Sequence, residues 1–281
     1  MGETTIEWTE KSWNPIAAYY EGKRGWMCSK PSAGCKNCYS ERMNVRLGNG
    51  LRYTPENVAK VDWQLVNLDE PGKWRKPALC FVESMGDLFH ESLPDELIER
   101  VWSQMLEYPQ HTFQVLTKRA ARMRELVTQF TQDATRSADH IWLGVSVENQ
   151  EQSDKRIPEL LKIPARVRFL SCEPLLGPID LYKWMRGDGH DSPWLDGVNW
   201  VICGGESGPG ARPMHPDWAR SLRDQCQAAR VPFFFKQWGD VVYQTSTNGN
   251  GSLTWTQPYR IGKKAAGRLL DGREWNEMPE V

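Results

Sequence analysis

Trp26-Met-Cys-Ser-Lys-Pro-Ser-Ala-Gly-Cys-Lys-Asn-Cys-Tyr-Ser-Glu41 is the stretch around which the rest of the chain is organised. Its three cysteines, Cys28, Cys35 and Cys38, follow the spacing C-x6-C-x2-C. Thiolates this close together converge on one soft-metal centre more readily than they form a disulfide framework. Structural zinc sites close with four ligands, and four-iron clusters usually take four cysteines. A set of three therefore leaves one coordination position for a remote side chain or a bound small molecule.

Length and composition are those of an ordinary globular protein. The 281 residues suit one α/β barrel-type domain, and the contents of 40% hydrophobic and 25% charged residues argue against disorder. The net charge of −1 gives no general attraction to nucleic acid or anionic membranes, although a local basic groove stays possible. The 14 tryptophans are core and interface side chains or, alternatively, stacking walls around a flat ligand.

The sequence also favours a cytoplasmic protein. No apolar run reaches the length of a membrane span, and the N-terminus lacks the apolar core of a signal peptide. In a reducing compartment, seven cysteines are expected to be thiols or metal ligands. Those outside the motif, Cys80, Cys172, Cys203 and Cys226, are interpreted as buried thiols, and no histidine has metal-ligand spacing.

Short apolar segments alternate with helical patterns along most of the chain. Strands are expected at residues 79–82, 112–116, 141–147, 167–170, 200–203 and 232–235, with a helix after each of the first three, and another at 216–229. Before this rhythm we predict a first strand at 13–18, a helix at 39–47 and a short helix near 58–65. Residues 177–197 are interpreted as an inserted loop, and Asn248-Gly249-Asn250-Gly251 as a turn.

Repeated β-α units with nearly all-apolar strands predict an α/β fold with a parallel sheet covered by helices. Six or seven units fit an open or closed barrel better than a flat doubly wound sheet, although periodicity alone does not decide. Residues 1–240 form the barrel in this interpretation, and residues 241–281 form a C-terminal extension that caps it.

Polar side chains follow nearly every expected strand. In barrel folds the carboxyl ends of the strands form the active face, and the cysteine loop follows the first strand onto the same face. The clusters are Glu83-Ser84 with Asp87, Thr117-Lys118-Arg119, Ser146 with Glu148-Asn149, Ser171 with Glu173, Glu206-Ser207, and Lys236-Gln237.

Clustered cysteines near the start of a partial βα barrel resemble the radical S-adenosylmethionine (radical SAM) superfamily, whose usual spacing is C-x3-C-x2-C. A more specific resemblance is to the phage-associated three-cysteine family of radical-SAM-like proteins. The matching motifs are Ile6-Glu7-Trp8-Thr9, Trp13-Asn14-Pro15, Gly34-Cys35-Lys36-Asn37-Cys38-Tyr39, Gly204-Gly205-Glu206-Ser207-Gly208 and Phe235-Lys236-Gln237-Trp238-Gly239. The first cysteine interval, at six residues, is longer than the usual one.

The resemblance implies a partial (βα)6-type barrel in which Cys28, Cys35 and Cys38 hold a [4Fe-4S] cluster and SAM chelates the remaining iron. It further implies reductive cleavage of SAM to a 5′-deoxyadenosyl radical that abstracts a substrate hydrogen. The expected SAM-binding residues are Tyr39, Ser84, Gly86, Asp87, Lys118, Ser146, Glu148 and Asn149, with Glu83 and Arg119 as alternative acceptor and cation. Glu173, Glu206 and Lys236 are expected to be catalytic.

The family's occurrence in phages, where some members remodel modified thymine in DNA, implies a nucleic-acid base or nucleotide as substrate and an isomerase-type or other base-modifying reaction. It also implies a flavodoxin- or ferredoxin-type electron donor, and the host cytoplasm as location for a phage-encoded protein. A small free metabolite stays possible as substrate. A different kind of function, as an alternative to an enzyme, is that of a zinc-stabilised nucleic-acid-binding or adaptor module without catalysis. Each SAM-site residue also has an ordinary interpretation as a solvated loop or helix cap, and Ser146 and Asn149 are good capping types.

Overall fold

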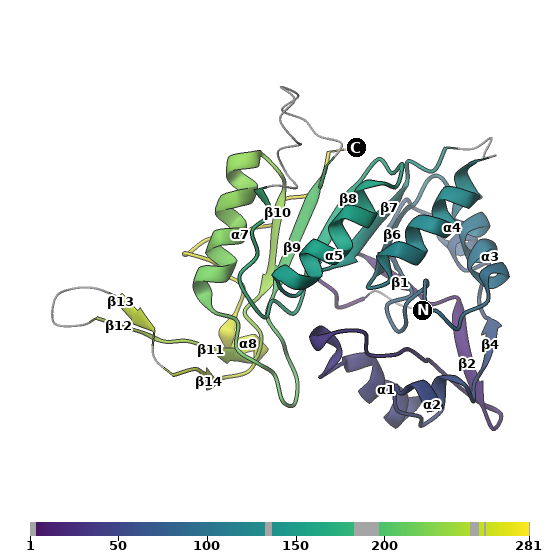
Figure 1. The fold of residues 1–281 in the computed structure, drawn as a ribbon, viewed down its shortest axis with the longest axis horizontal. Helices are drawn as coiled ribbons and strands as arrows, with labels where there is room; N and C mark the ends of the chain where they lie inside the picture. The colour runs from purple at the N-terminus through teal and green to yellow at the C-terminus, as the bar shows by residue number, and fades with distance from the viewer. Residues whose placement is uncertain (1–3, 133–136, 183–196, 248–252, 256, 281) are drawn as a thin grey trace. The chain divides into compact units, whose positions relative to one another are not determined.

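Seven strands form one sheet in the computed structural model, in the order β1-β5-β6-β7-β8-β9-β10 (Figure 1). The structure describes residues 4–132, 137–182, 197–247, 253–255 and 257–280. The strands are β1 (Lys11–Trp13), β5 (Leu79–Val82), β6 (Thr112–Thr117), β7 (Ile141–Ser146), β8 (Arg168–Cys172), β9 (Trp200–Gly204) and β10 (Phe233–Gln237). The pairs β1–β5, β5–β6, β6–β7 and β9–β10 are all parallel. The predicted α/β fold with a parallel sheet is confirmed.

The chain divides into two compact units. One contains residues 1–146 and 155–169, and the other contains residues 147–154 and 170–281. The helices that alternate with the strands are α3 (Asp95–Leu106), α4 (Ala120–Gln132), α5 (Gln150–Leu161) and α7 (Pro216–Ala229). Each lies at the place that the apolar periodicity predicted.

The first unit is built on the strongly apolar strands β5, β6 and β7 and on helices with one apolar face. In α3 the buried residues are Ile98, Val101, Trp102 and Met105, which recur at helical spacing along one side. Gly144 in β7 leaves room for the ring of Phe169, because a Cβ atom at this glycine would lie 2.5 Å from the ring. This close approach explains why a glycine stands inside a fully buried strand.

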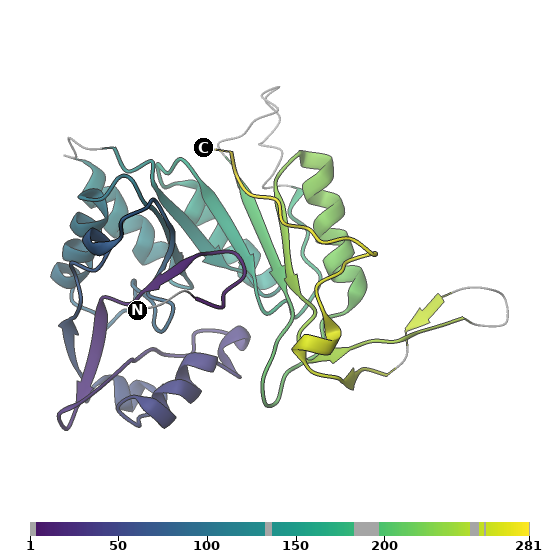
Figure 2. The same cartoon turned by 180° about the vertical axis from the view of Figure 1, so that it is seen from behind.

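A small antiparallel sheet in the order β3-β2-β4 lies in the same unit, near the purple N-terminal segment of Figure 2. Its strands are β2 (Ile16–Tyr20), β3 (Lys23–Gly25) and β4 (Asp62–Leu65), and the helices α1 (Tyr39–Leu47) and α2 (Pro55–Val58) lie between β3 and β4 in sequence. The buried residues Ala18, Met27, Tyr53 and Val58 form a cluster against which Cys28 and Cys38 pack. The cysteine segment is thereby attached to a core of its own.

Two predictions for this N-terminal region are wrong. The single strand expected at 13–18 is two strands, because Pro15 has no N–H for a sheet ladder and restricts Asn14 before it. The parallel ladder accordingly stops at Trp13, and β2 pairs with β4 instead. The helix expected near 58–65 is a helical turn, α2, followed by β4, whose alternating exposure is that of a strand.

The second unit contains β9, β10, α7 and the C-terminal segment. Helix α7 begins with His215 as N-cap and Pro216 in the first turn, and it ends at Arg230 with a left-handed backbone. Four short strands and a helical turn follow: β11 (Val241–Val242), β12 (Thr245–Thr247), β13 (Leu253–Trp255), β14 (Tyr259–Arg260) and α8 (Lys263–Ala266).

The end of the chain packs back onto β10 within this second unit. Phe234 forms a bridge with Asn276, Phe235 N–H donates to the Trp275 carbonyl, and Trp200 Nε1 donates to the Glu277 carbonyl at 2.9 Å. Most of the inserted loop expected at 177–197, and the turn expected at 248–251, lie outside the described residues. No helix among the described residues is long and apolar enough to cross a membrane.

Candidate functional site

The cysteine segment follows β3 and leads into α1. Cys35 closes a 3-10 turn, Ala33–Cys35, in which its N–H donates to the Ser32 carbonyl at 3.0 Å. Cys38 is the N-cap residue of α1. Burial raises the pKa of the Cys38 thiol, while the nearby backbone N–H groups of Glu41 and Ser40 lower it. Orphan N–H groups at a helix N-terminus favour a negative charge, so this position suits a thiolate.

Cys28 lies beside Arg119, with its Sγ 3.5 Å from the guanidinium. Burial raises the pKa of Cys28 to about 12, Arg119 lowers it, and Asp87, Cys35 and Cys38 raise it further. The three thiols thus lie within electrostatic range of one another and of a buried cation. Within the described part of the chain, no group of three or more His, Cys, Asp or Glu side chains is arranged to hold a metal ion.

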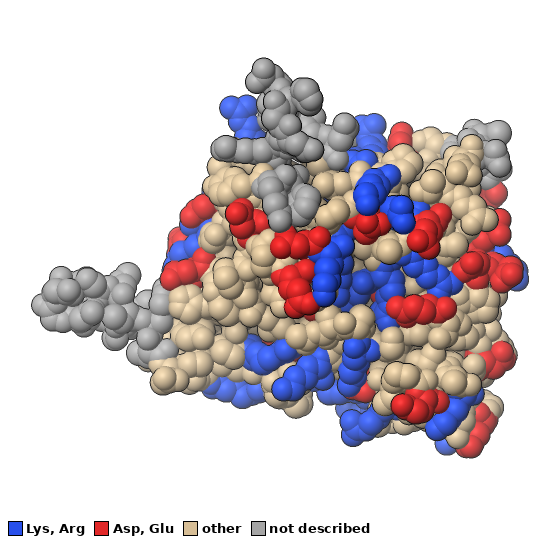
Figure 3. All heavy atoms as spheres, viewed as in Figure 1, with Lys and Arg blue, Asp and Glu red and all other residues tan. Residues whose placement is uncertain are grey.

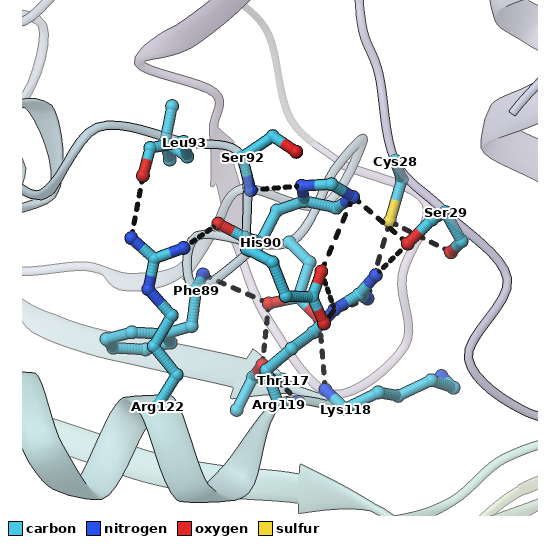
Figure 4. Close-up of polar contacts among 12 residues, drawn as sticks. Cys28, Ser29, Phe89, His90, Ser92, Leu93, Thr117, Lys118, Arg119 and Arg122 are labelled. Carbon is cyan, nitrogen blue, oxygen red and sulfur yellow. Dashed lines mark hydrogen bonds and ion pairs between the residues drawn. The ribbon is translucent and has the colours of Figure 1, made fainter. Parts of the chain in front are cut away.

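Arg119 connects the cysteine segment to the carboxyl ends of β5 and β6 (Figure 4). Its guanidinium donates to Asp87 Oδ2 at 3.0 Å, to Ser29 Oγ at 2.5 Å and to Cys28 Sγ at 3.5 Å. Its Nε donates to the exposed carboxylate of Glu91 at 3.2 Å. Burial by itself lowers the pKa of Arg119, but Asp87 and Cys28 raise it above its ordinary value. Arg119 is therefore a permanent cation beside Cys28.

Asp87 is the partner that keeps this cation in place. Its carboxylate accepts from Thr117 Oγ1 at 2.6 Å, from Lys118 N at 3.0 Å and from Phe89 N at 3.1 Å, in addition to Arg119. Burial opposes its charge, yet Arg119 and these donors hold the pKa of Asp87 below its usual value. Because protein groups already occupy the carboxylate, Asp87 acts here as a positioning residue.

His90 and Ser29 join this network, and sequence patterns alone did not indicate either. His90 Nδ1 accepts from Ser92 N at 3.1 Å, so the other ring nitrogen carries the proton and donates to Ser29 Oγ, 3.0 Å away. Burial and Arg119 lower the pKa of His90, which favours the neutral ring. A serine directly after the first cysteine and a histidine three residues after Asp87 were the only available signals.

Residues 83–86 form a tight turn after β5. Glu83 has a positive φ of 57° and is buried, and burial raises its pKa to about 8. The one hydrogen bond that its side-chain carboxyl group accepts in the described structure comes from Ile16 N, 3.3 Å away. A Cβ atom at Gly86 would lie 2.8 Å from Glu83 Oε1, so the glycine leaves room for this carboxyl group. Glu83 is thus a buried carboxyl group with acceptor capacity to spare.

Ser84 and Tyr39 tie α1 to this turn. Ser84 Oγ lies 2.5 Å from Ser12 Oγ, and the Tyr39 hydroxyl donates to the Ser84 carbonyl. Lys118 donates its backbone N–H to Asp87, and its ammonium group lowers the pKa of Cys38 from nearby. Of the two neighbouring cations, Arg119 is bound by the carboxylates of Asp87 and Glu91. The ammonium group of Lys118 contacts no carboxylate of this described network.

The residues after β7 have structural partners. The Ser146 carbonyl accepts from Arg156 at 2.6 Å in the first unit. In the second unit, Glu148 is buried and its carbonyl accepts from Leu176 N, and Asn149 Oδ1 accepts from Gln152 N at 3.0 Å. Asn149 is therefore a helix cap for α5, as its residue type allowed.

The second unit holds the three expected catalytic residues in two separate ion pairs. Lys236 Nζ lies 3.0 Å from Glu173 Oε1, and both side chains are partly exposed. Glu206 instead accepts two hydrogen bonds from the Arg212 guanidinium, at 2.8 and 2.6 Å, and one from Arg212 N. Glu206 closes its own loop through Arg212, and Lys236 pairs with Glu173.

Close backbone packing keeps the second of these ion pairs in place. A Cβ atom at Gly205 would lie 1.9 Å from the Trp238 carbonyl oxygen, and one at Gly239 would lie 2.3 Å from that of Glu206. The segments Gly204-Gly205-Glu206 and Trp238-Gly239 therefore contact each other at the ends of β9 and β10, and glycine at 205 and 239 allows their backbones to approach closely.

Comparison with curated proteins and with solved structures finds no match. A family model described as "Protein of unknown function (DUF5131)" matches residues 3–279. Because this match spans nearly the whole chain, the protein belongs to the DUF5131 family.

Proposed function

We propose that this protein is a radical SAM enzyme built on a partial parallel barrel. The observation that carries the proposal is the position of Cys28, which packs with Cys38 on one buried cluster and accepts from Arg119 of the buried Asp87–Arg119 pair. Three thiolates leave one position of a four-iron cluster open for a ligand. Arg119, which donates to Cys28 Sγ, compensates part of their negative charge.

Three cysteine thiols are the donor type that iron–sulfur clusters use, although the described side chains are not arranged around a common point for a metal ion. Cys28, Cys35 and Cys38 would hold the cluster, with the N-terminus of α1 at Cys38 and Arg119 at Cys28 stabilising the thiolates. When bound, such a cluster with SAM supplies reductive cleavage of SAM and a 5′-deoxyadenosyl radical. The chain's own residues bind and orient the two groups and exclude water from them.

Two neighbouring side chains suit the charged ends of SAM. Glu83 has spare acceptor capacity and a raised pKa, so a bound ammonium group would favour its charged form. Lys118 offers a cation for the carboxylate. Asp87 and Arg119, which neutralise each other, would hold Lys118 and the cysteine segment in position. Tyr39, Ser84 and Gly86 would shape this site within the first unit, through the contacts of the turn after β5.

The substrate we favour is a nucleic-acid base or a modified nucleotide, and the outcome an isomerisation or another base modification. In the second unit, Glu173 and Lys236 form the pair best suited to hold or move a proton, because their side chains are in contact and partly exposed. Glu206 would act as a positioning residue through Arg212.

The test is anaerobic iron and sulfide analysis, followed by incubation with dithionite and SAM and detection of 5′-deoxyadenosine. The variant is Cys28→Ala/Cys35→Ala/Cys38→Ala, and the matched control is Cys80→Ala, which removes a buried thiol outside the motif. We expect about four irons per chain in the wild type and the control, lost in the triple variant. One zinc ion per chain with no SAM cleavage would instead support the zinc-stabilised module.

A further inference from the structure

Helix α1 has its polar side inward and its apolar side outward. Its buried residues are Ser40, Glu41 and Asn44. Its large hydrophobic residues are exposed, namely Tyr39 (46%), Met43 (40%), Val45 (43%) and Leu47 (66%). A surface helix of a globular protein shows the opposite arrangement, with its apolar stripe against the core.

Hydrogen bonds fix this orientation. Ser40 donates to the Met85 carbonyl, and Glu41 pairs with Lys30 at 2.6 Å and accepts from Tyr53 N. Asn44 accepts from Trp26 N at 2.8 Å and donates to the Leu51 carbonyl at 2.8 Å. Turning the helix to bury Met43 and Leu47 would leave these buried polar groups without partners, which is costly. The outward apolar face is therefore a property of the fold.

Three of these four exposed side chains form one stripe along the helix, and Val45 lies outside it. Tyr39, Met43 and Leu47 are spaced at i, i+4 and i+8, and Arg42 and Arg46 lie one position before the second and third of them. Half of the eight large hydrophobic side chains that are exposed in the described residues belong to this one helix. Concentrated apolar surface of this kind marks an interaction site.

The surroundings of the stripe are strongly basic. Residues 22–55 contain seven Lys and Arg residues and a single acidic residue, Glu41, which is buried and paired with Lys30. The segment thus carries a net charge of +6 within a chain of net charge −1. Figure 3 shows Lys and Arg side chains, together with some acidic ones, beside uncharged surface where α1 and α2 lie. A partner that covers the stripe must be apolar at its centre and acidic around it.

The helix begins at Cys38, so a partner on α1 also lies next to the cysteine segment. We propose that the exposed face of α1 is the docking site of an acidic one-electron carrier protein. This inference rests on the proposed function, because the group held by the cysteines must receive its electron from outside the chain.

Other occupants fit less well. A second copy of this chain would place two basic segments against each other, which is repulsive in a two-fold symmetric contact. Nucleic acid would pair its phosphates with the basic side chains, but phosphate contacts do not account for the exposed apolar side chains of Met43 and Leu47. A protein interface explains both features, since apolar anchors with arginines are typical of interface centres.

The experiment measures binding of a purified flavodoxin, an acidic one-electron carrier, to the anaerobically reconstituted protein by titration calorimetry at low and high salt. One variant is Met43→Glu/Leu47→Glu, which places good helix formers on the stripe. Another is Arg46→Glu/Arg52→Glu, which reverses two exposed charges. The matched control is Arg75→Glu/Arg100→Glu, two exposed arginines outside residues 22–55.

We expect at least tenfold weaker flavodoxin binding for both variants and unchanged binding for the control, with the wild-type affinity falling as salt rises. SAM cleavage driven by dithionite should stay at the wild-type level in every variant, because dithionite needs no docking site. Equal binding by wild type and variants would overturn the inference. Loss of binding to a duplex DNA oligonucleotide alone, or loss of self-association in sedimentation, would also overturn it. Absence of SAM cleavage in the wild type would refute the proposed function and leave the binding result to be judged separately.

Discussion

Glu83 and Asp87 lie four residues apart after β5, and their surroundings shift the pKa values of the two carboxyl groups in opposite directions. Asp87 is surrounded by donors from Thr117, Lys118, Phe89 and Arg119, which hold its pKa below the usual value. Glu83 is equally buried but receives one N–H, and burial raises its pKa to about 8. Burial is common to both, so the number of donors and the presence of a cation decide the charge state.

The difference shows that one strand end can hold both a carboxylate that positions its neighbours and a carboxyl group that is able to bind a ligand. A carboxylate whose acceptors are all used fixes geometry, here that of Arg119 and the cysteine segment. A carboxyl group with one donor and a raised pKa is poised to respond to a ligand. Changes that remove donors from Asp87, or that prevent the side chain at position 83 from ionising, test this distinction.

The largest effect is expected from Arg119→Met. It leaves the charge of Asp87 buried without its cation, which typically destabilises a protein by about 3–5 kcal/mol. We expect a loss of that size in the free energy of unfolding, measured by urea denaturation of the metal-free protein. The pKa of Asp87 should rise at the same time, because its main stabilising charge is gone.

The double variant Asp87→Asn/Arg119→Met is the control for this prediction. It removes both charges and keeps an oxygen that can accept from Thr117 and Phe89. If the ion pair is what the site depends on, the double variant should recover most of the lost stability. A double variant as unstable as Arg119→Met would mean that the guanidinium acts through its contacts with Ser29 and Cys28 instead.

A smaller effect is expected from Glu83→Gln. The pKa of Glu83 is raised from 4.5 to about 8 in the folded protein, so folding favours the protonated form. Wild-type stability should then fall as pH rises from about 5 to 8, by roughly 3–4 kcal/mol, and level off above that. Glu83→Gln cannot ionise and should lose this pH dependence. Parallel stability–pH curves for the two proteins would contradict the prediction.

Much of the fold was predictable because apolar periodicity reports burial directly. Helices α1 and α7 begin and end where their sequence patterns predict, and the parallel strands differ from expectation by one or two residues. The failures lie at residues 13–18 and 58–65, where a small antiparallel sheet forms from strands that are distant in sequence. Local sequence propensity does not predict this pairing, because β2 and β4 stabilise each other only through tertiary contact.

The site was predictable in part. Clustering of Cys28, Cys35 and Cys38 at one metal centre was expected from their spacing and stays a prediction; in the structure Cys28 and Cys38 pack on one buried cluster. Which strand-end residue binds to which was not predictable. The pairs Asp87–Arg119, Glu173–Lys236 and Glu206–Arg212 depend on the register and rotamers of separate segments. The inverted helix α1 was hidden for a related reason, because its polar residues are buried by partners in other loops.

The smallest effect is expected from Thr117→Val, which keeps the shape of a β-branched side chain in β6. The Thr117 hydroxyl donates to Asp87 Oδ1 at 2.6 Å and accepts from Arg119 N at 2.9 Å, so valine removes both hydrogen bonds. We expect a loss of about 1–2 kcal/mol in urea denaturation, because Asp87 keeps its other donors and its cation. Thr112→Val, at the half-buried start of the same strand, is the matched control and should change stability by less than about 0.5 kcal/mol. Equal losses for the two variants would show that Asp87 does not depend on the number of its donors, and the contrast with Glu83 would then have to rest on Arg119 alone.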